Sequence, residues 1–174
     1  MTQKVGMARY YAVIALVIVL DQITKFAVEA KYAVHQFEPV TSFFNLGLTY
    51  NPGAAFSFLA HHDGWQRWFF TVLAVAAAVF FIVQIYQNRD KTLQNMGFAM
   101  IAGGALGNMI DRLRIGAVVD YLDFYWQGWH WPAFNLADIF VVGGAALLIL
   151  ASVTERVGQR PLQVVEIKQR QNKD

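Results

Sequence analysis

The stretch that decides the fold is MARYYAVIALVIVLDQITKFAV, residues 7–28. A helix that crosses a bilayer needs about 20 mostly apolar residues, and this segment is long enough. Asp21 and Lys25 interrupt it at i, i+4 spacing, which puts both side chains on one helical face. Ionisable groups inside a span are costly in lipid and indicate a functional site. The segment therefore predicts a membrane protein that depends on polar groups held at the bilayer.

The composition supports a membrane protein. Of the 174 residues, 56% are hydrophobic and 15% are charged, and the mean hydropathy is +0.35. Soluble domains carry about 45–50% apolar and about 25% charged residues. The chain has no cysteine, which excludes disulfides, thiolate zinc sites, iron–sulfur clusters and a cysteine nucleophile. Its 14 basic and 12 acidic residues nearly balance, so bulk charge gives no indication of nucleic-acid binding.

Three further segments have the length and apolarity of spans, at about residues 68–86, 93–113 and 135–153. The fold class is then an all-α polytopic membrane protein with four transmembrane helices, in one domain over residues 1–174. The first segment is similar to a secretory signal, but no small-x-small cleavage site follows it directly. Cleavage is therefore not expected.

Basic residues predict the orientation. Nine of the fourteen flank the spans on one side, which identifies the cytoplasm: Lys4, Arg9, Arg89, Lys91, Arg156, Arg160, Lys168, Arg170 and Lys173. Both termini are expected to be cytoplasmic, with a basic tail at about 156–174. Residues 29–67 and 114–134 then face outwards.

The two outward stretches differ in pattern. Residues 29–67 contain short apolar and aromatic runs and a turn at Asn51-Pro52-Gly53, which predict a small strand-rich element on the membrane. Residues 114–134 are dense in Trp and Tyr, as an interfacial belt is. We expect them to form a short loop or helix.

Polar residues collect at one depth. Three of the four spans and both outward stretches bring polar side chains to the outer membrane level. They are Asp21, Lys25, Asn51, Asn108, Asp111, Arg112, Asp120, Asp123, Asn135 and Asp138. This convergence predicts a functional site near the outer surface.

Several of these residues also have a purely structural interpretation. Asp21 and Lys25 make a possible ion pair that fixes the first helix. Asp138 follows Asn135 by three residues, as the acidic partner in a helix N-cap does. Asp123 fits a solvated loop carboxylate.

Two further sets of residues have structural interpretations as well. Arg112 and Arg114 are placed to reach outer headgroups. Gly103, Gly104 and Gly107 make a small-residue face for close helix packing.

The residue types favour aspartyl proteolysis. Two neighbouring carboxylates cannot both ionise cheaply, so one keeps a proton and the pair supplies an acid and a base. Asp111, Asp120 and Asp138 are the available carboxylates, and the residues alone do not separate Asp111 from Asp120. Such chemistry needs no cofactor, and the four histidines show no metal-ligand spacing. A Ser57–Lys25 dyad lacks a supporting motif.

A proton-coupled transporter or channel is the alternative from another functional class. It predicts ionisable groups at successive depths, whereas the cytoplasmic halves of the four expected spans lack them.

Five boxes carry a family resemblance. They are DQITK at 21–25, NPGAAF at 51–56, GGALGNMIDR at 103–112, GAVVDYLDF at 116–124 and FNLAD at 134–138. In this order and between four spans, they make the chain resemble the bacterial lipoprotein signal peptidases (signal peptidase II) over nearly its full length.

The resemblance implies an inner-membrane aspartyl endopeptidase whose site faces the periplasm. Its substrates would be diacylglyceryl-modified prolipoproteins, cut before the lipidated cysteine, and its other partners membrane lipids and the peptide antibiotic globomycin. It assigns catalysis to Asp120 and Asp138 and makes Asp111 structural. A polar shell around the pair and the substrate comprises Asp21, Lys25, Asn51, Asn108, Arg112 and Asn135.

Overall fold

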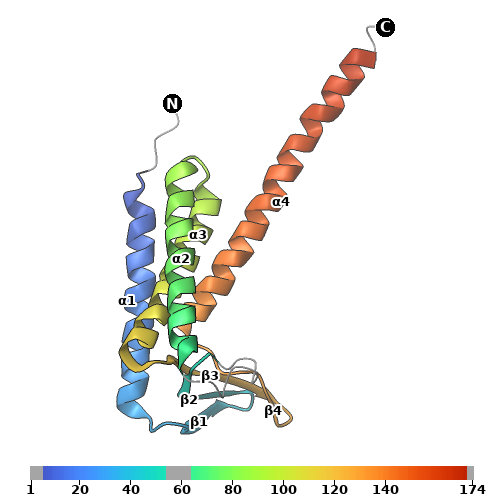
Figure 1. Ribbon diagram of the computed structural model, residues 1–174. Coiled ribbons are helices and arrows are strands. Elements are labelled where there is room, and N and C mark those ends of the chain that lie inside the picture. The colour runs from blue at the N-terminus through green and yellow to red at the C-terminus, as the bar shows by residue number, and fades with distance from the viewer. Residues whose placement is uncertain (1–5, 54–63, 172–174) are drawn as a thin grey trace.

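The computed structural model describes residues 6–53 and 64–171, with side chains as far as Glu155. The helices are α1 (Ala8–Lys31), α2 (Trp65–Gln87), α3 (Thr92–Ile115) and α4 (Leu136–Gln171). The strands are β1 (Phe37–Thr41), β2 (Phe44–Asn51), β3 (Val118–Trp126) and β4 (Trp129–His130). The sheet lies at one end of the helices, and α4 leans away from the other three (Figure 1).

Helix α3 is the centre of the bundle, since α1, α2 and α4 each pack mainly against it. Its glycines allow the close approach. A Cβ on Gly103 would lie 2.8 Å from the Val17 Cβ, and one on Gly104 would lie 2.5 Å from the Ala137 carbonyl oxygen. A Cβ on Gly107 would lie 2.6 Å from Asp21 Oδ2. The expected small-residue face thus lies against both α1 and α4.

Three of the described helices are long and apolar enough to cross a membrane: α1, α2, and α4 as far as Glu155. Helix α3 covers the expected third span at 93–113 and has 24 residues, but it does not reach the same apolarity. The reason is its position, because a helix surrounded by three others presents little surface to lipid and tolerates glycine and polar residues.

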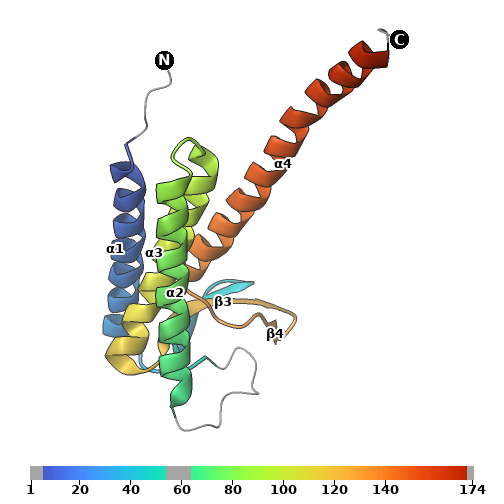
Figure 2. The same ribbon diagram turned by 45° about the horizontal axis from the view of Figure 1, so that its top comes forward.

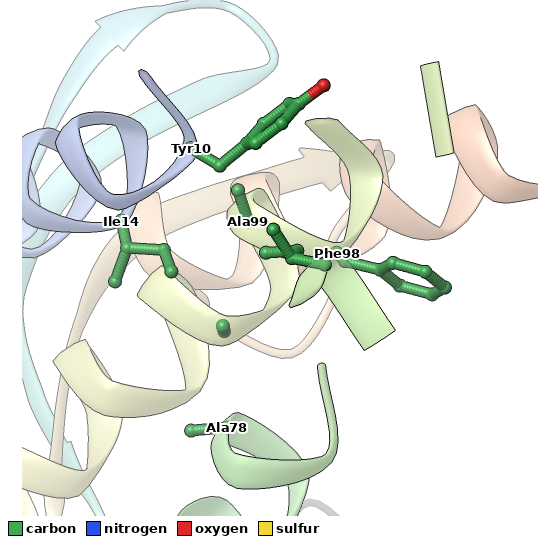
Figure 3. Packing of buried hydrophobic residues seen from close by; sticks show 7 residues of the cluster. Tyr10, Ile14, Ala78, Phe98 and Ala99 are labelled. Atoms are coloured by element: carbon green, nitrogen blue, oxygen red, sulfur yellow. The ribbon is translucent and has the colours of Figure 1, made fainter. Parts of the chain in front are cut away.

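An apolar cluster holds the helices together away from the sheet. Tyr10 and Ile14 of α1, Ala78 of α2, and Phe98 and Ala99 of α3 are all buried in it (Figure 3). This end of the bundle carries the start of α1 and the α2–α3 connection. The core therefore fixes the helices at the end opposite the polar residues.

The sheet is an antiparallel meander in the order β1-β2-β3-β4. The expectation of strands in residues 29–67 is confirmed by β1 and β2. The expected loop or helix in 114–134 is wrong for the described residues, which form β3 and β4. The cause is that side chains two residues apart in a strand lie on the same face. Val119 and Tyr121 of β3 therefore both pack against Val28, Tyr32 and Leu48.

The sheet register brings two predicted site residues together. Strands β2 and β3 pair with Thr49 opposite Asp120 and Asn51 opposite Val118. The two stretches expected to face outwards are therefore neighbours in one sheet. Residues 54–63, which include the last three residues of the NPGAAF box, lie outside the described part.

Helix α4 is longer than its expected span. It continues to Gln171, through most of the stretch expected as a basic tail (Figure 2). The change from apolar to polar sequence near residue 155 thus marks the end of the apolar portion but not the end of the helix.

The contact between α3 and α4 yields a prediction at adjacent glycines. A Cβ on Gly144 would lie 2.7 Å from the Gly97 carbonyl oxygen, whereas one on Gly143 would meet only the flexible end of Met100, at 3.1 Å. We expect Gly144→Ala to destabilise the fold by about 1–3 kcal/mol, the usual cost of overpacking. Gly143→Ala is the matched control and should be near neutral. The measurement is the thermal midpoint in detergent, and equal midpoints for the two variants would contradict this packing.

Candidate active site

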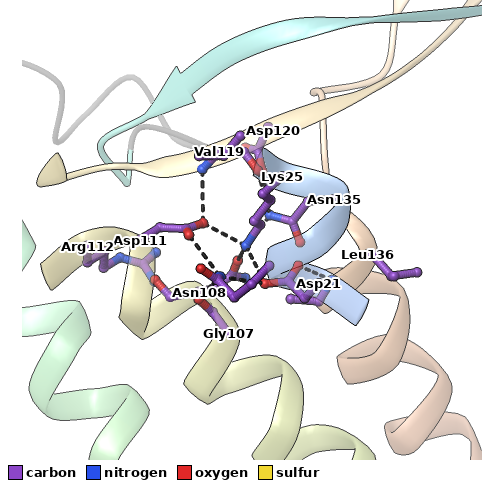
Figure 4. Close-up of polar contacts among 12 residues, drawn as sticks. Asp21, Lys25, Gly107, Asn108, Asp111, Arg112, Val119, Asp120, Asn135 and Leu136 are labelled. Carbon is purple, nitrogen blue, oxygen red and sulfur yellow. Dashed lines mark hydrogen bonds and ion pairs between the residues drawn. The ribbon is translucent and has the colours of Figure 1, made fainter. Parts of the chain in front are cut away.

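Lys25 lies at the centre of the polar cluster and is fully buried (Figure 4). Its Nζ is 2.8 Å from Asp21 Oδ2 and 2.6 Å from Asp111 Oδ2. It also donates to Asn108 Oδ1 at 2.7 Å. An ammonium group has three N–H donors, so these three partners saturate it. The expected Asp21–Lys25 ion pair is confirmed, with Asp111 as a second carboxylate.

The two carboxylates beside Lys25 each hold a further segment. Asp21 Oδ1 accepts the backbone N–H of Ala137 in α4, at 3.0 Å. Asp111 Oδ2 accepts the backbone N–H of Val119 in β3, at 3.2 Å. Gln22 donates to Asp111 Oδ1 at 3.0 Å and to the Gly107 carbonyl at 3.2 Å. One buried network therefore joins α1, α3, β3 and α4.

This environment argues against Lys25 as the base of a serine dyad. A general base needs a free lone pair, and every Lys25 N–H is engaged with an acceptor. Ser57, the other member of that alternative, lies outside the described residues.

Asn135 and Asp138 form a capping box at the start of α4. Asn135 Oδ1 accepts the Asp138 backbone N–H at 3.0 Å, and Asp138 Oδ2 accepts the Asn135 backbone N–H at 3.2 Å. The structural interpretation of Asp138 is therefore confirmed. It leaves Asp138 Oδ1 free to take part in the polar cluster.

Two amide side chains connect Asp120 with Asp138. Asn135 Nδ2 lies 2.7 Å from Asp120 Oδ1 and 3.0 Å from Asn108 Oδ1. Asn108 Nδ2 donates to Asp138 Oδ1 at 2.8 Å. Asn51 at the end of β2 donates to Asp120 Oδ2 at 3.0 Å. Asp120 and Asp138 thus belong to one hydrogen-bonded unit, whereas Asp111 faces Lys25.

The Asp120 carboxyl has an altered pKa. Burial raises the pKa of Asp120 to about 7 because desolvation penalises the carboxylate, and the charge of Asp138 raises it further. The hydrogen bonds from Asn51 and Asn135 and the charge of Lys25 act in the opposite direction. Asp120 therefore keeps its proton to a higher pH than an ordinary aspartate does.

The two arginines near the end of α3 have different surroundings. The Arg112 guanidinium lies 5.0 Å from the centre of the Phe70 ring, and its Nη1 donates to the Asn108 carbonyl at 3.3 Å. Arg114 pairs with Glu29 at 2.7 Å. Arg112 thus lies beside the polar cluster, and Arg114 is held by a carboxylate of α1.

Asp123 corrects one expectation. It is buried on β3 rather than solvated in a loop, accepting from Asn45 at 2.7 Å and lying 2.9 Å from His130 Nδ1. The register of β3 with its neighbours brings these partners to it.

Sequence reasoning missed two members of the cluster. Gln22, which touches both Asp21 and Asp111, carried a signal as a polar residue inside the first span. The Tyr121 hydroxyl donates to Thr24 Oγ1 at 2.8 Å and accepts the Leu136 N–H at 3.2 Å. No sequence signal distinguished Tyr121 from the other interfacial aromatic residues.

Comparisons with known proteins agree on one family. The family model for signal peptidase (SPase) II matches residues 13–154. A lipoprotein signal peptidase from Ralstonia nicotianae is 55% identical over 133 residues, which is 76% of this chain and 77% of that protein. One from Neisseria meningitidis is 50% identical over 152 residues, covering 87% and 92% of the two chains.

Solved structures show the same fold. A bacterial membrane enzyme solved by the in meso method at 2.3 Å resolution has a TM-score of 0.79 and 26% identity, covering 91% of this chain and 96% of its own. A second such structure, at 1.9 Å, has a TM-score of 0.72 and 28% identity over 87% and 96% of the chains.

The raised pKa of Asp120 predicts a pH-dependent stability. Because the folded-state pKa of about 7 exceeds the ordinary 3.8, folding binds a proton between these values. Stability therefore falls as pH rises from about 4 to about 7, by at most about 4 kcal/mol. We expect Asp120→Asn, which cannot ionise, to remove this loss. The difference in melting temperature between Asp120→Asn and the wild type should therefore be more in favour of the variant at pH 8 than at pH 5.

Asp123→Asn is the control, since its loss of acceptors for Asn45 and His130 should lower the melting temperature at both pH values. The readout is the thermal midpoint at pH 5 and pH 8 in one detergent. An Asp120→Asn variant that follows the wild-type pH dependence would show that Asp120 does not cause it.

Proposed function

The chain belongs to the signal peptidase II family, and we propose that Asp120 and Asp138 are the catalytic pair of this enzyme. It is a membrane-embedded aspartic peptidase that removes the signal peptide from prolipoproteins. The transporter alternative has no support in these comparisons. The observation that carries the proposal is the Asn135–Asn108 bridge between the two carboxylates.

The pair supplies an acid and a base for attack by water. One carboxylate takes a proton from water while the oxygen attacks the scissile carbonyl carbon, and the protonated carboxyl gives its proton to the carbonyl oxygen. The tetrahedral diol then collapses: the C–N bond breaks, the leaving nitrogen takes a proton from the carboxyl that received it from water, and a diol proton returns to the other. Water and the amide thus become an acid and an amine.

The neighbouring residues have supporting roles in this proposal. Asn51, Asn108 and Asn135 orient the carboxyl groups through their amides. Arg112 places a positive charge beside both carboxylates, near the negative charge that forms on the carbonyl oxygen. The ion pairs of Lys25 with Asp21 and Asp111, and the close packing at Gly103, Gly104 and Gly107, hold the framework.

We propose that α3 is the fourth transmembrane helix. Its 24 residues give a length of about 36 Å, enough for a hydrocarbon core of about 30 Å. It has the same number of residues as α1, and the three apolar helices around it shield its polar groups.

In the proposed orientation the sheet lies at the periplasmic surface of the inner membrane and both termini are cytoplasmic. Basic residues collect at the other end, and three exposed indoles of the β3–β4 region suit the interface: Trp126 (70% exposed), Trp129 (62%) and Trp131 (57%). The pair then lies near the headgroups, where a diacylglyceryl-modified cysteine presents its peptide while its chains stay in lipid. A cyclic peptide such as globomycin would compete for the same place.

The proposed pair is tested by asparagine substitution. Asp120→Asn and Asp138→Asn are nearly isosteric and should each lower turnover of a lipidated prolipoprotein about 10³-fold, as lost acid–base catalysis does. The double variant should be scarcely worse, because the two act as a unit. Turnover is measured per folded enzyme. Asp111→Asn is the control: we expect less folded protein but retained turnover. An active Asp120→Asn beside an inactive, folded Asp111→Asn would move the pair to Asp111 and Asp138.

The orientation is tested with single cysteines, since the chain has none. Gln127→Cys lies in the exposed β3–β4 turn and Asp90→Cys in the exposed α2–α3 connection. In intact spheroplasts, an impermeant maleimide should label Gln127→Cys directly and Asp90→Cys only after lysis. The reverse pattern would invert the topology, and labelling of both before lysis would exclude four spans.

A further inference from the structure

Hydrogen bonding alone does not distinguish the two carboxylates. Asp120 accepts one N–H at each oxygen, from Asn51 and Asn135. Asp138 also accepts one at each oxygen, from the Asn108 side chain and the Asn135 backbone. A pair of this kind needs another feature to decide which member keeps the proton.

The direction of the Asn108 amide supplies that feature. An asparagine amide can present either its oxygen or its nitrogen to a neighbour, and its surroundings decide which. An ammonium group only donates, so the atom that faces Lys25 must be Asn108 Oδ1, at 2.7 Å. Asn135 Nδ2 donates to the same oxygen, at 3.0 Å. The Asn108 N–H group therefore points to Asp138 Oδ1, at 2.8 Å.

The Asn108 amide also carries the effect of the Lys25 charge. A cation bound to the amide oxygen polarises the amide and strengthens the hydrogen bond that its N–H donates. A single side-chain amide, that of Asn108, connects Asp138 with the Lys25 ammonium. Asp120 accepts from Asn51 and Asn135, and the Asn135 side-chain oxygen accepts a backbone N–H rather than a cation.

Several other charged or titratable groups face Asp138 from the elements packed against it. They are Asp21 and Lys25 of α1, Asp111 and Arg112 of α3, and Asp120 and Tyr121 of β3. Arg112 interacts with both members of the pair and so does not separate them. Asp21 and Asp111 are bound directly to the ammonium. The Lys25 charge also acts on Asp120 through space, so what separates the two carboxyls is the hydrogen-bonded contact Lys25–Asn108–Asp138. Asp120 instead accepts its hydrogen bonds from Asn51 and Asn135.

We propose that Lys25 is a positioning residue for the reaction: it fixes the Asn108 amide toward Asp138, which makes Asp138 the ionised base and leaves the proton on Asp120. The inference rests on the proposed pair of Asp120 and Asp138. Asp138 then takes the proton from the attacking water, and Asp120 donates its proton to the carbonyl oxygen. Lys25 itself touches neither the water nor the substrate.

The test removes the ammonium without changing the formal charge of its cluster. Lys25→Met combined with Asp111→Asn keeps the net charge of −1 that Asp21, Lys25 and Asp111 carry together, and Asp111→Asn alone keeps Lys25 as the control. The measurement is kcat against pH for a lipidated prolipoprotein, per folded enzyme. We expect the acidic limb of the double variant to move up by about one pH unit, as loss of one charge-assisted hydrogen bond implies. Its kcat should fall about tenfold with KM little changed, whereas Asp111→Asn, which keeps Lys25 and loses a negative charge, should not move the limb up.

An acidic limb in the double variant equal to that of the wild type, whose cluster carries the same charge, would overturn the role of Lys25 and leave the catalytic pair intact. If the double variant does not fold, Lys25→Gln combined with Asp111→Asn replaces it, because the glutamine amide keeps an N–H donor in place of the ammonium but carries no charge. The same upward shift supports the inference, and an unshifted limb overturns it. Failure of the pair itself is recognised separately, by an Asp138→Asn enzyme that retains turnover.

Discussion

The rest of the structure depends on one constraint: the Lys25 ammonium is buried in a membrane protein and must have all its donors satisfied. Removing a charge from water costs several kcal/mol unless partners compensate. Asp21, Asp111 and Asn108 do so from two helices. Asp21 Oδ1 and Asp111 Oδ2 in turn accept backbone N–H groups of α4 and β3. Satisfying one cation thus sets the positions of four segments, including both that carry the proposed catalytic residues.

A central helix makes this arrangement possible in lipid. Helix α3 contributes Asn108, Asp111 and Arg112, whose polarity would be costly on a lipid-facing surface. The helices around it supply the apolar exterior, and its glycines bring their backbones close enough for Asp21 to lie directly beside Gly107. The surrounding helices therefore supply the lipid-facing apolar surface, and α3 supplies polar site residues. This explains why the helix richest in site residues has the weakest hydropathy signal.

In the proposed mechanism, the capping box of α4 gives one residue a structural and a catalytic role. Asp138 uses Oδ2 to cap the helix and Oδ1 to bind Asn108. Asn135 likewise uses its oxygen for the cap and its amide nitrogen for Asp120. The cap gives both side chains a fixed orientation before substrate binds, and such preorganisation is what acid–base catalysis requires. Two interpretations that compete at the level of sequence are thus compatible in the structure.

The sequence by itself determined the membrane class, the helix positions and the convergence of polar groups at one end of the helices, because apolar length and spacing are local properties. It also determined the family, through five boxes in order. Only the tertiary structure decided that residues 118–126 pair as a strand with β2, that Asp123 is buried against Asn45, and that Gln22 and Tyr121 join the cluster. The sequence separated Asp111 from Asp120 only through the family resemblance, and the structure adds the physical difference: Asp111 is bound to Lys25, whereas Asp120 is bridged to Asp138. The physical reason is that carboxylates of equal chemistry differ only in their partners, and those partners come from segments up to 116 residues apart.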